Sequence, residues 1–517
     1  MLAALLLCAS MPASAQVSDG KWWAAEGPHF KVLSSGSRED AEDMVIKLER
    51  LDQALRMFRG IAATTAPYPE TAKPTVFQFG EARDVGRLVG SESVLGFFIP
   101  RAGQSVAFVP LKADRSVDRA GAPGTRESYE FYDHRVAPHE VLFHEYTHYF
   151  MFQHAPAAYP SWYVEGFAEL FGMIRLTDTG FDLGEAPESR KGTIETFAVE
   201  YENLFDPPKD RRSVVVDYAQ GWLATSYLTF EPSRKGQLAK YLSLVNQGKP
   251  NKEAAQEAFG DLKKLERELN AYRRQRARGV SVSFPSQSKP PITVRALGAD
   301  ENARMDMMMR AKAGVTKAQA RSLTASARKL VETYPNSVPV LLAATESEFD
   351  AGELANADAL AQRALAIDPK AIDAMLFRAS VALEYAKKDP AYIAQARAHF
   401  IAANRLNNDH PVALQGYYRT FVLAGQTPPK DALIALEAAF SAAPFDANIR
   451  RDLAYLLLTE NRDREALLVL GPIVNSPHVE KSLRDLREAI TKLEAGDRQP
   501  LIDELKPKLE EDEKKKA

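Results

Sequence analysis

Apolar and polar residues follow two different periodic patterns between residues 21 and 111. The segment from Ser37 to Arg59 has apolar residues three or four positions apart, the spacing of one helix face. Short runs rich in β-branched and aromatic residues surround it, as is typical of strands. These runs are residues 29–33, 74–79, 94–99 and 105–110. The pattern predicts a small sheet accompanied by one or two helices.

Further along the chain the apolar residues mainly have helical spacing. Residues 112–130 are polar and contain Gly and Pro, so we expect a loop there. Helical patterns follow at residues 138–152 and 161–176, and again from 218 to 278. Residues 284–291 are rich in Pro and Ser, which is the composition of a linker. We therefore place a domain boundary in a linker at residues 281–300.

The chain beyond this linker is rich in Ala and Leu, and prolines recur along it. Pro335 and Pro369 lie 34 residues apart, and later prolines continue the series after one insertion. These later prolines are Pro411, Pro444 and Pro477. The pattern resembles the tetratricopeptide repeat (TPR), which implies an all-α solenoid over residues 301–500. An irregular helical bundle is the alternative, and residues 501–517 are expected to form a charged tail.

Composition narrows the class of protein. The 517 residues are enough for about three domains, and 26% of them are charged, as in ordinary globular proteins. Lys and Arg number 66 against 69 Asp and Glu, for a net charge of −3. This balance gives no indication of a nucleic-acid partner. Past the first residues, no apolar run is long enough to predict a membrane span.

The first fifteen residues predict a secretory signal peptide. An apolar run at residues 2–8 precedes the small residues Ala13, Ser14 and Ala15, after which cleavage is expected. A buried N-terminal helix is the alternative. Cleavage would remove Cys8, the sole cysteine, so the mature chain would contain neither disulfides nor thiolate metal ligands. We expect a protein exported to the periplasm or the medium.

Residues 144–148 read His-Glu-Tyr-Thr-His within one helical segment. Positions four apart lie on the same helix face, so His144 and His148 can bind one zinc ion together. Glu145 is offset around the helix, where its carboxylate can deprotonate a water molecule beside the metal. The alternative is a surface helix whose two histidines have no shared role.

A second helical segment carries two acidic residues in apolar surroundings. It begins after Pro160, and Glu165 and Glu169 share a face among residues such as Trp162 and Phe167. Carboxylates in such surroundings need a metal, a histidine or another base as a partner.

The two segments together resemble the gluzincin metallopeptidases, which include thermolysin and the aminopeptidase N group. The resemblance lies in His-Glu-x-x-His, sixteen intervening residues, and then Glu165 within Trp-x-x-Glu-Gly-x-Ala-Glu. It implies a zincin-like α+β domain with an α/β part at residues 16–112 and a helical zinc-site part at 113–280. It also implies one Zn²⁺ per chain. By the resemblance the ligands are His144, His148 and Glu165, the catalytic base is Glu145, and Glu169 orients a ligating imidazole.

The same resemblance implies a tyrosine that stabilises the developing oxyanion. Tyr218 is the best-placed candidate, and Tyr163, Tyr201 and Tyr227 compete with it. The strand at residues 105–109 is expected to be the edge that pairs with a peptide. The chain has no Gly-x-Met-Glu-Asn segment, which the aminopeptidase group uses to bind a free N-terminus, so an endopeptidase is favoured. His139 and His154 flank the motif but are not expected to bind zinc.

These inferences lead to one main hypothesis and two alternatives. The main hypothesis is an exported zinc metallopeptidase that cleaves peptide or protein substrates, with a TPR-like domain that binds substrate or a protein partner. The first alternative is an exported TPR scaffold with an inactive metallopeptidase-like domain. The second is a zinc hydrolase that acts on another kind of bond. If the linker separates two domains, a fragment ending near Arg278 should fold and keep its zinc.

Overall fold

The structure is a computed structural model of the chain, and most of the chain is described. The described residues are 21–62, 67–91, 94–112, 114–116, 119–120, 129–130, 134–155, 157–207, 214–275, 277–285, 289–475 and 483–509. The expected signal peptide at residues 1–15 and Cys8 lie outside these ranges.

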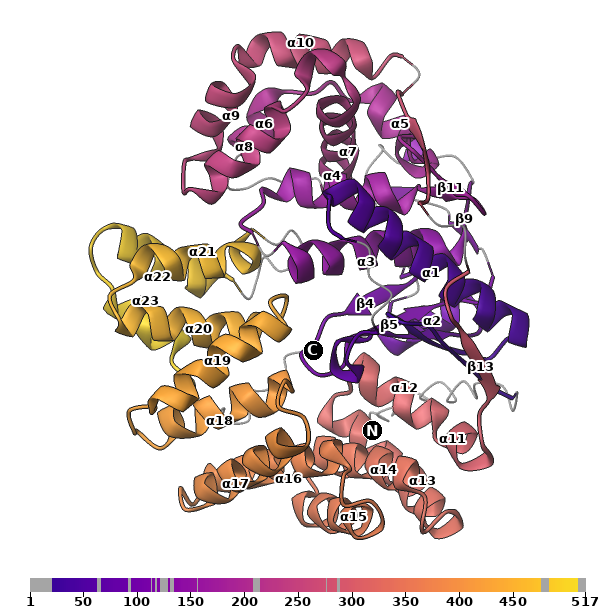
Figure 1. Cartoon of the computed structure of the whole chain (residues 1–517), viewed down its shortest axis with the longest axis vertical. Coiled ribbons are helices and arrows are strands. Elements are labelled where there is room, and N and C mark those ends of the chain that lie inside the picture. Colours follow the sequence, from indigo (N-terminus) through magenta and orange to yellow (C-terminus); the bar gives the residue numbers. More distant parts are fainter. Residues whose placement is uncertain are drawn as a thin grey trace, which may run out of the picture.

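A six-stranded mixed sheet forms the N-terminal part (Figure 1). Its strand order is β13-β1-β2-β3-β5-β4. Neighbours β2, β3 and β5 are parallel, whereas β1, β13 and β4 run antiparallel to the strands beside them. The strands are β1 (Trp23–Glu26), β2 (Lys31–Ser34), β3 (Thr75–Gln78), β4 (Phe97–Ile99), β5 (Val106–Val109) and β13 (Thr293–Ala296).

The order of the strands corrects one expectation about the substrate edge. The run at residues 105–109 becomes β5, which lies between β3 and β4 and has no free edge. The edge strand is β4, because the chain turns back after residue 99 and pairs antiparallel with β5 on its open side. The sequence pattern predicts both β4 and β5, but it does not predict which of these two strands forms the edge of the sheet.

The two faces of the sheet belong to different cores, because side chains alternate along each strand. Val32 and Val76 point to the core shared with α1 (Arg38–Arg59) and α3 (Pro138–His154). Leu33 and Phe77 point to the opposite core, which α12 (Met305–Ala313) covers. In Figure 1 the sheet accordingly lies between α1 and α3 on one side and α12 on the other.

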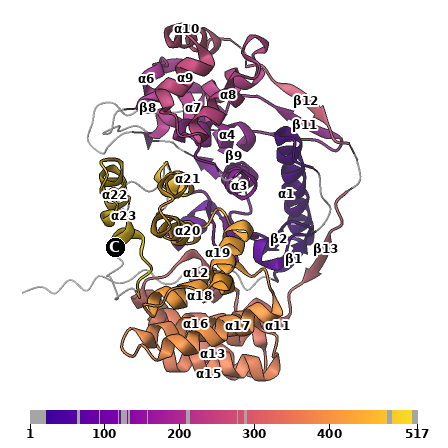
Figure 2. The ribbon, with the colours of Figure 1, turned by 60° about the vertical axis from the view of Figure 1, so that its left-hand side comes forward.

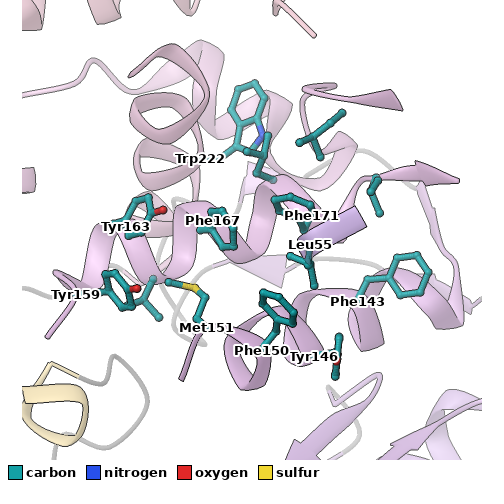
Figure 3. Close-up of a cluster of buried hydrophobic side chains, with 14 of the residues drawn as sticks. Leu55, Phe143, Tyr146, Phe150, Met151, Tyr159, Tyr163, Phe167, Phe171 and Trp222 are labelled. Carbon is teal, nitrogen blue, oxygen red and sulfur yellow. The ribbon is translucent and has the colours of Figure 1, made fainter. Parts of the chain in front are cut away.

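Helices dominate the second part of the N-terminal region and cover the sheet's α3 side. Leu55 of α1, Phe150 of α3 and Phe167 of α4 belong to one apolar core, which Figure 3 shows in close-up. The helices and short 3-10 turns are α2 (Ala82–Leu88), α4 (Ser161–Gly172), α5 (Glu188–Thr196), α6 (Tyr201–Phe205), α7 (Val214–Phe230), α8 (Gln237–Asn246), α9 (Asn251–Phe259), α10 (Leu262–Tyr272), η1 (Glu70–Ala72) and η2 (Pro232–Arg234).

Short strands appear where the sequence pattern predicts loop or helix. Residues 112–130 contribute to two small antiparallel pairs, β6 with β9 and β7 with β8. The helix expected at 161–176 ends at Gly172, and the next residues form β10. These strands are β6 (Asp114–Ser116), β7 (Arg119–Ala120), β8 (Tyr129–Glu130), β9 (His134–Val136), β10 (Arg175–Leu176), β11 (Gly180–Leu183) and β12 (Val280–Ser283).

The expected linker at residues 281–300 is built into the N-terminal fold, which corrects the domain boundary. β12 pairs with β11, and β13 pairs with β1. Without β12 and β13, β11 and β1 would each leave a row of backbone polar groups without partners. α12 then covers the sheet with Met305 and Met309, so the N-terminal fold extends to about residue 313. The Pro and Ser content of this segment predicts a linker, because composition does not show that the two ends of the segment pair as strands.

The C-terminal region is a solenoid-like series of helices that pack on their sequence neighbours. Small residues line these contacts, and Ala357, Ala361 and Ala364 are fully buried. The short helix α11 (Ala299–Ala303) precedes α12 and contacts both α12 and α14. The helices of the C-terminal region are α13 (Lys317–Thr333), α14 (Val338–Ala351), α15 (Leu354–Ile367), α16 (Ile372–Ala386), α17 (Tyr392–Leu406), α18 (Pro411–Leu423), α19 (Lys430–Ala442), α20 (Ala447–Thr459), α21 (Asp463–Val474), α22 (Arg484–Glu494) and α23 (Gln499–Leu505).

The expected charged tail begins later than residue 501. Residues 501–505 belong to α23, and Leu501 and Leu505 are buried in the core of the last helices. These leucines are four positions apart, so one face of α23 is apolar although the segment is rich in charge.

The solenoid-like region also packs directly against the N-terminal part. The ring of Phe445, in the loop between α19 and α20, lies 4.6 Å from the ring of Tyr149 on α3, centroid to centroid. The carboxylate of Asp446 accepts a hydrogen bond from the backbone N–H of Ala102 at 2.9 Å. Phe445 therefore contacts the cores of both regions. A fragment ending near Arg278 would lose β12, β13, α12 and this contact, so the structure argues against its independent folding.

We expect Phe445→Ala to destabilise the whole chain by about 2–3 kcal/mol, because the ring is only partly buried and a fully buried Phe costs more. Ile434→Ala is the control, since Ile434 on α19 is 55% exposed. This control should change stability by less than about 0.5 kcal/mol. Urea denaturation followed by circular dichroism measures both. Equal stability of the two variants would contradict a shared core.

A buried polar network joins α1 to α3 on the face of the sheet that these two helices cover. The Tyr146 hydroxyl donates to Asp52 at 2.7 Å, and Asp52 also accepts from Arg56 at 2.5 Å. The Tyr68 hydroxyl donates to Nε2 of His154 at 2.8 Å, and Arg56 donates to the same nitrogen at 3.3 Å. His154 must be neutral to accept these bonds. Burial first, and then the charge of Arg56, lower the pKa of His154 to about 4.

This pKa predicts a loss of stability in acid. Because the unfolded chain binds a proton at His154 more readily, stability is complete above about pH 6.5 and falls as pH drops toward 4. The contribution of His154 is on the order of 2–3 kcal/mol. His154→Gln keeps an acceptor without a titrating group, so its stability should fall less between pH 7 and 4.5. Parallel pH profiles of wild type and variant, measured by denaturant titration, would contradict this assignment.

Candidate metal centre

The helix α3 presents His144 and His148 on one side and a row of buried apolar and aromatic residues on the other. Leu142, Phe143, Tyr146, Tyr149 and Phe150 are buried, which fixes the rotation of the helix. The side chains of His144 and His148 are only 15% and 13% exposed. α4 passes close by, since a Cβ on Gly172 would lie 3.4 Å from the Cβ of His144.

The predicted ligand atoms of α3 and α4 form a small triangle. Nε2 of His144 lies 3.1 Å from Nε2 of His148, and these nitrogens lie 3.4 and 3.5 Å from Oε2 of Glu165. Ligands 2.0–2.1 Å from a tetrahedral zinc ion are about 3.3–3.4 Å apart. The three donors therefore fit one zinc ion and leave a fourth position open. In the part of the chain that is described, no other group of three such donors occurs.

The electrostatics of the triangle favour a cation. Glu165 is only 1% exposed, so its carboxylate cannot rely on bulk water for solvation. Burial alone would lower the pKa of His144, but the hydrogen bond to Glu165 and the charges of Glu169, Glu165 and Glu145 raise it to about 9. A divalent cation would replace the bound proton in this anionic setting.

Glu169 lies near His144, but its main partner is a residue that the sequence does not indicate. Its Oε1 is 3.8 Å from Nδ1 of His144, too far for a hydrogen bond. The same oxygen accepts from Nε and Nη2 of Arg190 at 3.2 and 2.9 Å. Arg190 comes from α5, which no motif marks. The one available signal is the need of a buried carboxylate for a cation.

Tyr218 is brought to the site by a close crossing of α4 and α7. A Cβ on Gly166 would lie 2.1 Å from the carbonyl oxygen of Gly221, so the two helices touch through their backbones. The Tyr218 ring is then 5.9 Å from that of His144, and the guanidinium of Arg190 lies 4.8 Å from its centroid. Burial, and then the charges of Glu165 and Glu145, raise the pKa of Tyr218 well above its usual range. The hydroxyl therefore keeps its proton.

The three competing tyrosines have other surroundings. Arg59 donates to the hydroxyl of Tyr163 at 3.3 Å, and the hydroxyl of Tyr227 donates to Glu268 at 3.1 Å. Tyr201 lies beneath the ammonium group of Lys263. Tyr218 is thus the tyrosine that the fold brings to the candidate ligands.

The two flanking histidines lie away from the ligand triangle. His139 lines a separate cavity of about 240 Å³ with Phe143 and Ile174. His154 belongs to the network described above, with Tyr68 and Arg56.

Comparisons with known proteins add little to this geometry. No family model matches the chain, and no curated protein matches it. Among solved structures, a thermophilic TPR protein of Thermus thermophilus is similar at a TM-score of 0.32 and 18% identity. The match covers 38% of this chain and all of that protein. In the described residues no helix has the length and apolarity that crossing a bilayer requires.

Purified protein should bind about one zinc ion, and His148→Ala or Glu165→Gln should lose most of it, because each removes one of three protein ligands. His139→Ala is the matched control, since it removes a histidine of the same helix outside the triangle. Metal content after dialysis, measured by mass spectrometry, tests this. Full zinc occupancy in both ligand variants would show that the assignment is wrong.

Proposed function

We propose that this chain is an exported zinc-dependent metallopeptidase of the gluzincin type, acting as an endopeptidase on peptide or protein substrates. The main support is the triangle of His144, His148 and Glu165, whose dimensions fit tetrahedral zinc with one open position. The adjacent Glu145 and the nearby Tyr218 add the base and the donor that peptide hydrolysis requires. Export rests on the signal-like sequence of residues 1–15, and the destination is the periplasm or the medium.

In this proposal the three ligands bind one zinc ion, which when bound polarises a carbonyl and lowers the pKa of water. Glu145 takes a proton from the attacking water and transfers it to the leaving amine. Because Glu145 directly follows His144 on the helix, we place its carboxylate beside the three ligand atoms and not among them. Its charge raises the pKa of both His144 and Tyr218, consistent with a location near both groups.

Tyr218 has the protonation state that an oxyanion donor needs. Its raised pKa keeps the hydroxyl available to donate to the oxygen that becomes negative during attack. We assign Arg190 a positioning role, because it contacts both the ring of Tyr218 and the carboxylate of Glu169. Arg190 thereby links the oxyanion donor to the group behind His144.

The edge strand β4 supports an extended peptide as the substrate. Among the described strands it pairs on one side only, with β5, and we propose that its other edge receives a substrate backbone. Phe98 of β4 packs on Tyr149 of α3, with ring centroids 5.4 Å apart. The edge therefore runs beside the helix that contributes two of the ligands. We propose that the TPR-like helices bind substrate or a protein partner.

The decisive variant is Glu145→Gln, which removes the proton acceptor and keeps the size of the side chain. Hydrolysis of casein should fall by at least about a hundredfold, while zinc content and melting temperature change little. Glu140→Gln on the same helix is the control, since Glu140 lies at the separate cavity with His139, and it should keep wild-type activity. Cleavage at a near wild-type rate by Glu145→Gln would contradict the mechanism. A wild type that binds zinc but cleaves no protein would instead favour the inactive scaffold or another substrate.

Glu169→Gln should behave differently from Glu145→Gln. It leaves the base in place but removes the charge behind His144, so zinc affinity should fall by roughly tenfold. Zinc competition with a chelator measures this change directly. Unchanged zinc affinity would limit Glu169 to a structural ion pair with Arg190.

A further inference from the structure

A second cavity lies on the opposite face of the sheet from the metal centre. Its volume is about 420 Å³, within the range of small-molecule sites. One wall is the sheet, where Leu33 and Phe77 point away from the core that contains α3. The other wall consists of residues from α12, α14, α16 and the start of α18. In Figure 2, α12, α16 and α18 lie beyond β1 and β2 as seen from α3. The cavity shares no residue with the metal centre.

Positive charge is in excess around this cavity. Five cationic side chains line it, against three carboxylates. The cations are Lys31, Lys73, Arg101, Arg304 and Lys312, and the carboxylates are Glu70, Glu346 and Asp373. Two of the carboxylates already pair with lysines of the same cavity, Lys73 with Glu70 at 3.1 Å and Lys312 with Glu346 at 3.0 Å. Lys31 pairs with Glu26 outside the cavity at 2.9 Å, so the excess falls on the two arginines.

Arg304 is the clearest sign that a partner is missing. Its Nη1 donates to the thioether sulfur of Met308 at 2.8 Å, which is a weak acceptor. Its Nε is buried and has no hydrogen-bond partner among the described residues. Burial lowers the pKa of Arg304, although Glu301, Asp300, Glu346 and Asp373 act in the other direction. Arg304 is half-buried, and a guanidinium whose Nε is shielded from water without a partner is stabilised when an anion binds it.

Two further polar groups on the wall of the cavity lack partners. Within the described part of the chain, Nδ1 of His410 is buried without a hydrogen bond, and the residue is only 4% exposed. The guanidinium of Arg101 also has no side-chain partner among the described residues. The remaining wall is mostly apolar and includes Phe77, Leu342 and Phe377, with Thr75, Gln104 and Ser380 as its polar members.

We infer that this cavity binds a small amphipathic anion, whose carboxylate or phosphate group contacts Arg304 while its apolar body lies against Phe77. The guanidinium provides paired donors for either head group. The apolar wall would contact an acyl or aromatic body of the ligand, because each methylene buried there increases the binding affinity. This site is independent of the proposed peptidase activity, because its residues and its face of the sheet are different.

The test uses the full chain and the fluorescent anion 1-anilinonaphthalene-8-sulfonate, which has one sulfonate on an apolar ring system. We expect saturable binding of about one dye per chain, displaced by decanoate or decyl phosphate but not by decanol at the same concentration. The lower displacing concentration identifies the preferred head group. Displacement by decanol as readily as by both anions, or the absence of saturable binding, would overturn the inference.

Two variants locate the binding. Arg304→Met should weaken dye binding at least about tenfold while keeping or raising the melting temperature, because it removes a poorly paired, half-buried charge. Leu342→Trp should block binding by filling the cavity. Arg310→Gln is the matched control on α12, since Arg310 forms an ion pair with Asp306 and does not line the cavity. Wild-type dye affinity in Arg304→Met would overturn the inference, whatever the fate of Leu342→Trp.

Discussion

The buried carboxylate of Glu165 is the constraint around which the N-terminal part is arranged. A carboxylate that is 1% exposed requires polar or positively charged partners, and the two imidazoles of α3 lie 3.4 and 3.5 Å from it. This contact can form only if α3 and α4 lie side by side in one orientation. A Cβ at Gly172 of α4 would be in ordinary van der Waals contact with His144 of α3, whereas Gly166 permits the much closer packing of α4 and α7. Tyr218 and Arg190 then reach the same place from α7 and α5.

The sheet separates this centre from the second cavity. Because side chains alternate along each strand, Val32 and Val76 support the helices of the metal centre, whereas Leu33 and Phe77 line the core and cavity beneath α12. The solenoid-like region closes that second side and returns to touch α3 through Phe445. The two regions are therefore linked at Tyr149, the residue that follows His148. A ligand in the cavity and a substrate at the metal would meet the same sheet from opposite faces.

Local pattern was sufficient for elements whose geometry depends on nearby residues. Amphipathic spacing predicted α1 and α3, and β-rich runs predicted β2, β3, β4 and β5 close to their observed bounds. The spacing of four between His144 and His148 placed both imidazoles on one face, since a helix repeats every 3.6 residues. Glu165 was implied by the family resemblance, and the fold brings it to the two histidines.

Tertiary structure alone decided the features that depend on residues far apart in the sequence. β13 returns across more than two hundred residues to pair with β1, so a segment with the composition of a linker became part of the sheet. β5 lost its expected place at the edge because β4 folded back against it. Arg190 has no motif around it, and only the packing of α5 brings it to Glu169 and Tyr218. The sequence determined which residues can share a helix face or a strand, because those relations are set by backbone geometry. It could not determine which faces meet, because that depends on burial and pairing across the whole chain.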